Sequence, residues 1–559
     1  MSKQQDSIIE QQQRGSLEVV RFLEENGYRH VFGLPGSSMV SVLYDLQDSP
    51  VEYVSTIHES VAVAAADGYA RVAGAGLAFV YMLPGTANGL GNLHNAWRDE
   101  SPVIVIASQN CSRWRTKEGT VGENDLVALT RPFTRLSQEL SLGMPVRSWL
   151  EAARRVGKGT PAGPAFLSIP TDVFEEEAPG QELRTSIQAK GGAPEDIHSV
   201  VEALCTAERP VIMAGGQLRR YGGSRFIESL AERFEIPVIL EGGFNDRLPI
   251  SPGHSHYFGN VLTEGAKLEQ EADVAIAIGC RLMLEGHPRE QPWFPNASML
   301  VHVNADQAKL EETRTADWVA ACDPGSFASK LLTEMSAVTM NSELHLRRKA
   351  RLAEQRNLMR SSLDGGDPVG RAMKPYINAL ACLHDAMDRG WVVDESVLAS
   401  QVLASSLKSG DGEKFIGISG GSLGWAAGAS VGVALASGEP VTAVMGDGAL
   451  RFNAQGLWTI NAYNLPITLI ILDNGGYGST RHFERQYIAK LGAKAKNKPS
   501  YLNSDLRELG PGVDRIMDGF GIPSYRVAPG QDPRDAILHA WEKSTQGPNA
   551  VIIPVEFEG

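Results

Sequence analysis

The chain alternates short runs of continuously apolar residues with longer amphipathic or alanine-rich stretches. The runs include AFVYML, PVIVIAS, PVIMAGG, DVAIAIG, SMLVHVN, PVTAVMG, PITLIIL and AVIIPVEF. A strand that is apolar throughout is buried on both faces, which is typical of a parallel sheet covered by helices on each side. The alternation therefore predicts an α/β protein built from doubly wound parallel sheets.

Two polar segments divide the chain into three parts of similar size. Residues 176–195 are polar and rich in glycine and proline, and residues 341–370 are highly charged and end in a Gly/Pro breaker. The length of 559 residues suffices for three or four domains of about 150 residues each. The sequence thus predicts three α/β domains, over residues 1–185, 190–340 and 370–559.

Composition argues against several classes of partner. The chain carries 66 acidic and 52 basic residues and a net charge of −14, so we expect no binding to nucleic acid or to an anionic membrane surface. Residues 415–438 contain no charge, but their glycine, alanine and serine favour a buried helix over a transmembrane one. The five cysteines are scattered and the N-terminus has no apolar signal segment, so a cytoplasmic protein without a disulfide scaffold is expected.

One segment of the C-terminal third has the pattern of a cation and phosphate site. An apolar strand at 441–445 leads into GDG at 446–448, a helix of about four turns is expected next, and a second strand at 467–472 ends in DNGG. A strand–helix–strand unit makes the strands parallel, so Asp447 and Asn474 should lie together at their carboxyl ends. Such oxygen ligands suit Mg²⁺ or Ca²⁺, and the start of the helix would favour a phosphate. GDG alone also occurs in plain tight turns; its spacing to Asn474 favours the site.

The N-terminal third holds a second candidate, Glu59. The segment VEYVSTIHESVAVAAADGYARVAG predicts a strand, a turn and an alanine-rich helix, with Glu59 where the helix begins. On these residues alone, an acidic side chain at that position is explained by its favourable interaction with the helix dipole.

The spacing from GDG to Asn474 resembles the diphosphate-binding motif of thiamine-diphosphate (ThDP) enzymes, in which GDG is followed by a pair of asparagines. The first asparagine of that pair is Asp473 here. The resemblance implies that Asp447, Asn474 and the backbone oxygen of Gly476 bind Mg²⁺, and that Leu423 wedges the cofactor into a bent shape. The other residues that the resemblance assigns to the cofactor are Glu395, Ser396, Gly421, Ser422, Gly446, Gly448, Ala449, Tyr477 and Gly478.

The motifs VFGLPGSS, HESVAVAAADGYAR, LPGTANGLGNLHNAW and SPVIVIASQN are similar in order and spacing to the pyrimidine-binding domain of the same enzymes. The resemblance covers essentially the whole chain and implies a pyrimidine-binding, a central and a diphosphate-binding domain. It implies that Glu59 bonds N1′ of the cofactor's pyrimidine and promotes loss of the thiazolium C2 proton. In this family the two halves of the cofactor face different subunits, so we expect a homodimer or homotetramer with active sites at the subunit interface.

Within the family the chain resembles the benzoylformate decarboxylase branch, through VFGLPGSS, LHNAW, GLWTINAYNLPI and YGSTRHF. The resemblance implies that Ser37 binds the carboxylate of the substrate. A serine after Pro-Gly also fits a helix cap, which is the alternative for this residue. The residues expected to shape the substrate pocket are Ser37, Ser479, Thr480, His482 and Phe483.

Departures from that branch leave the reaction open. The branch has a histidine in the turn where this chain reads VYMLP, so that proton relay is missing or replaced by Tyr81. His287 matches a second relay histidine loosely, and a solvated loop histidine is the alternative. Gln109 matches a glutamine that approaches the cofactor in carboligases, or else it is a polar strand end. His58, directly before Glu59, is typical of acetolactate synthase-like members.

The sequence thus predicts a ThDP- and Mg²⁺-dependent 2-keto acid decarboxylase or carboligase. The alternative is a 2-hydroxyacyl-CoA lyase or a benzaldehyde-lyase-like carboligase, which the missing histidine and the cations Arg113 and Lys117 favour. A subunit contact is the other explanation for those cations. A ThDP fold retained as a non-catalytic regulatory subunit is a remote third hypothesis. FAD is not favoured, because the glycines of residues 215–223 fit a plain turn at the end of a strand.

Overall fold

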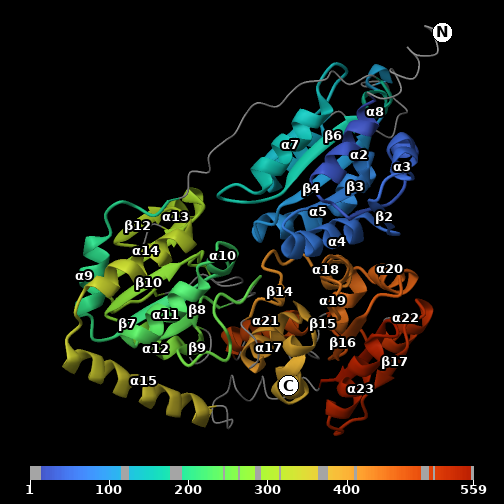
Figure 1. Ribbon diagram of the computed structural model, residues 1–559. Coiled ribbons are helices and arrows are strands. Elements are labelled where there is room, and N and C mark those ends of the chain that lie inside the picture. The colour runs from blue at the N-terminus through green and yellow to red at the C-terminus, as the bar shows by residue number, and fades with distance from the viewer. Residues whose placement is uncertain are drawn as a thin grey trace, which may run out of the picture. The chain divides into compact units, whose positions relative to one another are not determined.

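The computed structural model describes residues 14–114, 125–176, 192–242, 246–261, 265–283, 291–313, 316–362, 376–407, 412–492, 503–507 and 510–555. The chain forms two compact units. The first unit joins Met1–Gln188 with Ile418–Pro554, and the second joins Ala189–Gly417 with Val555–Gly559. The described residues contain three six-stranded parallel sheets flanked by helices, which confirms the predicted fold class (Figure 1).

The first sheet has the order β2-β1-β3-β4-β6-β5, and each adjacent pair is parallel. Every residue of β4 and β6 is buried, as expected for central strands covered on both faces. The strands are β1 (His30–Gly33), β2 (Glu52–Ser55), β3 (Gly76–Tyr81), β4 (Val103–Gln109), β5 (Leu136–Glu139) and β6 (Ala165–Pro170). The helices are α2 (Gly15–Glu25), α3 (Val40–Leu46), α4 (Glu59–Ala73), α5 (Met82–Arg98), α6 (Leu126–Thr130), α7 (Val146–Gly157) and α8 (Thr171–Glu175).

The second sheet has the order β12-β11-β10-β7-β8-β9, again parallel throughout. Its strands are β7 (Pro210–Ala214), β8 (Val238–Leu240), β9 (Tyr257–Asn260), β10 (Val274–Ile278), β11 (Met299–Asn304) and β12 (Trp318–Ala321). Its helices are α9 (His198–Thr206), α10 (Gly216–Arg220), α11 (Ser224–Phe234), α12 (Gly265–Glu271), α13 (Gln307–Thr313), α14 (Pro324–Ala337) and α15 (Ser342–Ser362).

Helix α15 covers most of the highly charged segment 341–370 that divides the second and third parts of the sequence. One of its cations is not solvated. Arg348 is 2% exposed and donates hydrogen bonds to the carbonyl oxygens of Leu204, Ala207 and Phe234, which lie at or near the ends of α9 and α11. The segment is therefore part of the second unit's packing, because a buried guanidinium needs such acceptors.

The third sheet has the order β14-β13-β15-β16-β18-β17. Its strands are β13 (Trp391–Glu395), β14 (Phe415–Gly417), β15 (Val441–Gly446), β16 (Ile467–Asp473), β17 (Ser524–Arg526) and β18 (Asn549–Pro554). Its helices are α17 (Ser400–Ser406), α18 (Ala426–Ser437), α19 (Asp447–Phe452), α20 (Gly456–Ala462), α21 (Gly478–Leu491), α22 (Val513–Gly519) and α23 (Arg534–Ser544).

In the uncharged stretch at 415–438, the predicted buried helix is limited to α18, and the stretch begins with the strand β14 and a turn. In the part of the chain that the structure describes, no helix is long and apolar enough to cross a membrane.

Helix α18 packs along α4 inside the first unit (Figure 1). The contact is unusually close because glycines face it from both helices. A Cβ on Gly68 would lie 2.1 Å from the carbonyl oxygen of Ala429, and one on Gly432 would lie 1.9 Å from that of Ala65. Side chains at these positions would force the two backbones apart, so the small residues fix how near α4 and α18 can approach.

We expect Gly432→Ala to destabilise the protein by about 1–3 kcal/mol, the usual cost of overpacking a close contact. The added Cβ would also lie 2.5 Å from the backbone nitrogen of Tyr69, so a helix must shift. Urea unfolding measures the change. Gly519→Ala in α22 is the control, because its Cβ would meet nothing within 4 Å. Equal stability of wild type and Gly432→Ala would contradict the close packing.

Candidate functional site

Strands β15 and β16 bring GDG and DNGG to one edge of the third sheet. The strands are parallel neighbours, and their register pairs Gly446 with Leu472. Asp447 directly follows β15, and Asn474 directly follows Asp473, the last residue of β16, so both residues lie at the carboxyl end of a strand. The expected helix of about four turns is wrong in one respect: the chain turns at Asn453, so the six-residue α19 is followed by a separate α20.

Asp447 is a buried carboxyl group that could bind a cation. It is 1% exposed, and neither of its carboxylate oxygens makes a well-aligned hydrogen bond, although the backbone N–H groups of Asn474 and Gly448 lie close enough to lower its pKa. Among the described residues, no other carboxyl group has both oxygens buried and unpartnered. Burial, followed by the charge of Asp473, raises the pKa of Asp447 from its ordinary value of 3.8 to about 6. A divalent cation would supply the missing positive partner.

The turn after β16 is held in shape by Arg481, a buried residue of α21. Its guanidinium donates to the carbonyl oxygens of Asn474 at 3.1 Å and Gly475 at 3.0 Å. The backbone of Gly476 bridges to Asp505, and a Cβ on Gly476 would lie 2.1 Å from the carbonyl oxygen of Ser504. The turn is therefore rigid, and its first two carbonyl oxygens are already engaged by Arg481.

The GDG turn and the DNGG turn approach each other at their glycines. A Cβ on Gly448 would lie 3.0 Å from the ring of Tyr477 and 3.6 Å from the carbonyl oxygen of Gly476. No group of three or more His, Cys, Asp or Glu side chains in the described ranges could hold a metal. A cation here would thus rely on the Asp447 carboxylate together with amide and backbone oxygens, a donor set that suits Mg²⁺ or Ca²⁺.

Asp473, which replaces the first asparagine of the family's pair, has its own partners. Its Oδ2 lies 2.8 Å from the guanidinium of Arg526 on β17, and its Oδ1 accepts from the backbone N–H of Gly475 at 3.2 Å. Arg526 also pairs with Asp514. The extra negative charge next to Asp447 is therefore balanced by an arginine from a neighbouring strand.

Glu59 begins α4, as the sequence predicts, and it is buried with 5% exposure. Its Oε2 accepts a hydrogen bond from the side-chain amide of Asn88 on α5 at 3.0 Å. A Cβ on Gly85 would lie 2.9 Å from Oε1, so only glycine leaves room for the carboxyl group there. His58 caps the helix by accepting from the backbone N–H of Ser60. The carboxyl group is oriented by α5, whereas a carboxylate that only compensated a helix dipole would need no such support.

Ser37 and Tyr81 lie together. Their hydroxyl oxygens are 3.5 Å apart, and a Cβ on Gly36 would lie 2.3 Å from the ring of Tyr81. Tyr81 ends β3, and Met82 after it has a φ of 44°, in the left-handed region that residues other than glycine rarely adopt. Two hydroxyl groups from separate elements therefore converge beside a strained backbone position.

The other predicted residues are distributed as follows. Gln109 ends β4 and is 1% exposed, with its side-chain oxygen accepting from the N–H of Asn110. Glu395 ends β13 in the second unit, and Ser396 directly after it donates to the buried carboxyl group of Asp394. His287 lies outside the described residues. Ser479, Thr480, His482 and Phe483 all fall on α21, and Gly421, Ser422 and Leu423 on the turn before α18.

Sequence reasoning did not single out Asn88, Arg481 or Asn95, which contact the candidate residues directly. Asn88 and Asn95 lie within the motif LPGTANGLGNLHNAW, so their positions in a matching motif were the available signal. Arg481 follows the YGST sequence within YGSTRHF. Nothing in the local pattern says which backbone groups these side chains reach.

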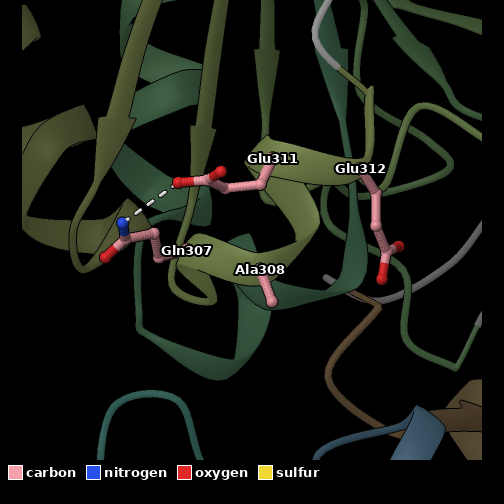
Figure 2. Close-up of a pocket in the computed structure, with 4 residues that line it drawn as sticks. All are labelled: Gln307, Ala308, Glu311 and Glu312. Atoms are coloured by element: carbon pink, nitrogen blue, oxygen red, sulfur yellow. Dashed lines mark hydrogen bonds between the residues drawn. The ribbon is translucent and has the colours of Figure 1, made fainter.

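A surface pocket of the second unit is lined by Gln307, Ala308, Glu311 and Glu312, all on α13 (Figure 2). The side chain of Gln307 donates to Glu311 at 3.2 Å. The lining contains none of the predicted cofactor or substrate residues, and two of its four side chains are acidic. We therefore place the candidate site at the edge of the third sheet and at the start of α4, not here.

Three segments of the chain match descriptions of one family. Residues 14–129 match "Thiamine pyrophosphate enzyme, N-terminal TPP binding domain", residues 197–331 match its central domain, and residues 399–553 match its C-terminal TPP binding domain. The three matches occur in the order that the sequence motifs predict.

Curated relatives and solved structures agree with these matches. A probable acetolactate synthase large subunit from Methanocaldococcus jannaschii is 27% identical over 94% of this chain and 90% of its own. A benzoylformate decarboxylase from Pseudomonas aeruginosa is 26% identical over 93% and 94%. The thiamine diphosphate-dependent 4-hydroxybenzoylformate decarboxylase of Rhodococcus jostii RHA1 is similar in fold, with a TM-score of 0.82 at 23% identity over 98% and 99%.

We expect Asp447→Asn to stabilise the metal-free protein near pH 7 and to remove stabilisation by added Mg²⁺. Because the pKa of Asp447 is about 6 in the folded chain and near 3.8 when unfolded, the folded state holds the proton more tightly. Wild-type unfolding free energy should therefore fall as pH rises from about 4 to 6, by up to about 3 kcal/mol. The asparagine has no proton to lose, so this part of the pH dependence should disappear.

Thermal unfolding at pH 5 and pH 7.5, with and without Mg²⁺ and ThDP, measures both effects. Asp48→Asn, at an exposed position, is the control and should change neither. A mutant that Mg²⁺ and ThDP stabilise as much as wild type would rule out Asp447 as a ligand.

Proposed function

Because the chain belongs to the thiamine pyrophosphate enzyme family, we propose that it is a ThDP- and Mg²⁺-dependent 2-keto acid decarboxylase or carboligase. It is an enzyme of the group that includes acetolactate synthases and benzoylformate decarboxylases. The observation that carries the proposal is the pair of buried carboxyl groups, Asp447 without a well-aligned hydrogen bond and Glu59 oriented by Asn88. The first suits a cation and the second suits proton exchange with a cofactor ring.

The diphosphate half of the cofactor would be held through the cation. Asp447, the side-chain oxygen of Asn474 and the carbonyl oxygen of Gly476 are the proposed ligands. Arg481 supports this assignment because it already occupies the carbonyl oxygens of Asn474 and Gly475. Asp473 is balanced by Arg526 at 2.8 Å, so its charge need not be met by the cation.

Glu59 is the proposed acid–base residue. When bound, ThDP supplies an acidic C2–H on its thiazolium ring and an electron sink for the donor substrate. Glu59 would hold or release a proton at N1′ of the pyrimidine, because it is buried and its carboxyl group is fixed at Oε2 by Asn88. Gly85 leaves space beside Oε1, and this is the oxygen that remains for the pyrimidine.

Ser37 and Tyr81 are the proposed contacts to the donor substrate. Their hydroxyl groups, 3.5 Å apart, can both donate to one carboxylate, which is the group that a 2-keto acid loses. Tyr81 is then the proton donor in place of the branch's missing histidine. Gln109, His287 and the side chains Ser479, Thr480, His482 and Phe483 remain proposed contributors to catalysis or to the substrate pocket.

A 2-hydroxyacyl-CoA lyase or a benzaldehyde-lyase-like carboligase is the second candidate. Tyr81 in place of a histidine favours it, because these donors are cleaved without loss of CO₂. The cation Arg113 supports it less well, since its guanidinium already pairs with Glu176 at 2.8 Å. A regulatory subunit without catalysis would need neither an oriented Glu59 nor a buried carboxylate at Asp447 that suits a cation.

We further propose a homodimer or homotetramer in which one subunit's Glu59 faces the cation site of another. Buried residues of α4 and α18 pack within one chain. The remaining surface around α19 and α20 keeps large apolar side chains exposed, with Phe452 at 56% and Trp458 at 38%. Such side chains beside a candidate active site are suited to contact with a second subunit.

Glu59→Gln should keep ThDP bound and slow exchange of its C2 proton by about 10²–10⁴-fold, the usual worth of a positioned acid–base group. Glutamine keeps the size and one acceptor oxygen but cannot share a proton with N1′. C2–H/D exchange of bound ThDP, followed by NMR after acid quench, measures this without any substrate. Glu52→Gln, an exposed glutamate on β2, is the control. If C2 exchange in Glu59→Gln were as fast as in the wild type, Glu59 would have no role in activating the cofactor.

Among pyruvate, benzoylformate and branched-chain 2-keto acids, we expect at least one to release CO₂ with the wild-type enzyme. For that donor, Ser37→Ala should raise KM by about tenfold through loss of one hydrogen bond to a charged group. Tyr81→Phe should lower kcat more than it changes KM, because it removes a proton donor. Cleavage of a 2-hydroxyacyl-CoA without CO₂ release from any keto acid would favour the second candidate.

A further inference from the structure

The turn that carries Leu423 is held by side chains of the N-terminal part of the first unit. The turn spans residues 419–425, between β14 and α18, and Gly421 adopts a φ of 75° within it. Its side-chain contacts include Asn95 on α5, Asp99 directly after α5, Asp67 on α4 and Asn453. The position of Leu423 therefore depends on residues more than 300 positions away in sequence.

Asn95 on α5 makes the central contact. It is 0% exposed. Its Oδ1 accepts from the backbone N–H of Ser422 at 3.1 Å, and its Nδ2 donates to the carbonyl oxygen of Ser422 at 2.8 Å. The amide thus pairs with both groups of one residue, as a neighbouring strand would. A Cβ on Gly420 would lie 2.4 Å from Oδ1, so the turn approaches Asn95 as closely as glycine allows.

The same amide is connected to the start of α4. Asn95 Nδ2 also donates to Oδ1 of Asn92 at 2.8 Å, and Asn92 donates to the carbonyl oxygen and the hydroxyl of Ser60, each at 2.9 Å. Asn453 donates to the carbonyl oxygen of Gly424 at 2.9 Å and to the Ser60 hydroxyl at 3.4 Å. Two routes therefore join Ser60, the residue after the proposed acid–base group, to the turn around Leu423.

We propose that Asn95 is a positioning residue for the cofactor, which holds the Ser422 peptide and so fixes the position of Leu423. The inference rests on the proposed function, because Leu423 matters only if ThDP binds against it. The side chain of asparagine suits this role because its acceptor oxygen and its donor nitrogen extend equally far from the helix. Aspartate can only accept, and leucine of the same shape can do neither.

Removal of Asn95 should leave the fold intact, because a separate buried cluster joins the same two segments. Arg71 donates to Asp67 at 2.8 Å and to Asp99 at 2.7 Å. The indole N–H of Trp425 donates to Asp67 at 2.7 Å, and Ser419 donates to Asp99 through its N–H and hydroxyl. The ends of the turn stay anchored in an Asn95 variant, and only its middle is released.

The test compares two ligands by calorimetric titration in the presence of Mg²⁺: ThDP, and inorganic diphosphate. Diphosphate needs only the cation site at Asp447, whereas ThDP also needs the turn at Leu423. With Asn95→Leu we expect ThDP affinity to fall about tenfold or more and diphosphate affinity to stay within about twofold. Asn95→Asp should lose ThDP affinity too, since it cannot donate to the Ser422 carbonyl, and it serves if the leucine variant does not fold.

Asn304→Leu is the matched control. Asn304 is 1% exposed in the second unit, donates to the carbonyl oxygen of Cys280 at 2.6 Å and accepts from the N–H of Asp306 at 2.8 Å. Loss of Asn304 should lower the unfolding temperature without changing the affinity for ThDP relative to the affinity for diphosphate. Equal affinities of wild type and Asn95 variants for ThDP would overturn the inference, as would a parallel loss of both ligands. Wild-type protein that binds no ThDP would overturn the proposed function itself.

Discussion

The close packing of α4 against α18 is the contact on which the candidate site depends. It brings the helix that begins at Glu59 beside the helix that follows the Leu423 turn, although some 360 residues separate them in sequence. Gly68 and Gly432 permit the approach, because any Cβ there would lie within about 2 Å of the opposite backbone. The spacing between these two segments, both of which are proposed to contact ThDP, is therefore fixed by backbone contact. Side-chain rearrangement cannot easily change it.

Polar groups in this contact give it a defined register. Apolar surfaces of alanine and valine could slide along one another with little loss, whereas hydrogen bonds are directional. Asp67, Arg71 and Asp99 are buried, and each is satisfied by partners from both sides, including Trp425. Breaking such a buried cluster leaves an uncompensated charge, at a cost of about 3–5 kcal/mol. The contact between Asn95 and the Ser422 peptide adds to this cluster by holding the middle of the 419–425 turn.

The sequence was informative where one residue's role follows from its own strand or helix. Continuous apolar runs predicted the parallel sheets, and Asp447 and Asn474 were located because parallel strands end at one edge. It was uninformative where a role depends on a distant partner. The helix after Gly448 breaks at Asn453, whose side chain donates to the carbonyl oxygen of Gly424. Asn88 and Asn95 likewise look like ordinary helix-surface amides until α4 and the 419–425 turn are placed beside α5.

The contrast between two sets of buried acidic residues explains why Asp447 marks the site. Asp67 and Asp99 are as buried as Asp447, yet each has an arginine and further donors around it. In the described part of the chain, Asp447 alone has both carboxylate oxygens buried without a partner, and Asp473 beside it is balanced by Arg526. A buried carboxylate that lacks well-aligned donors lowers the stability of the folded chain. A cation bound at Asp447, as proposed above, would offset that loss.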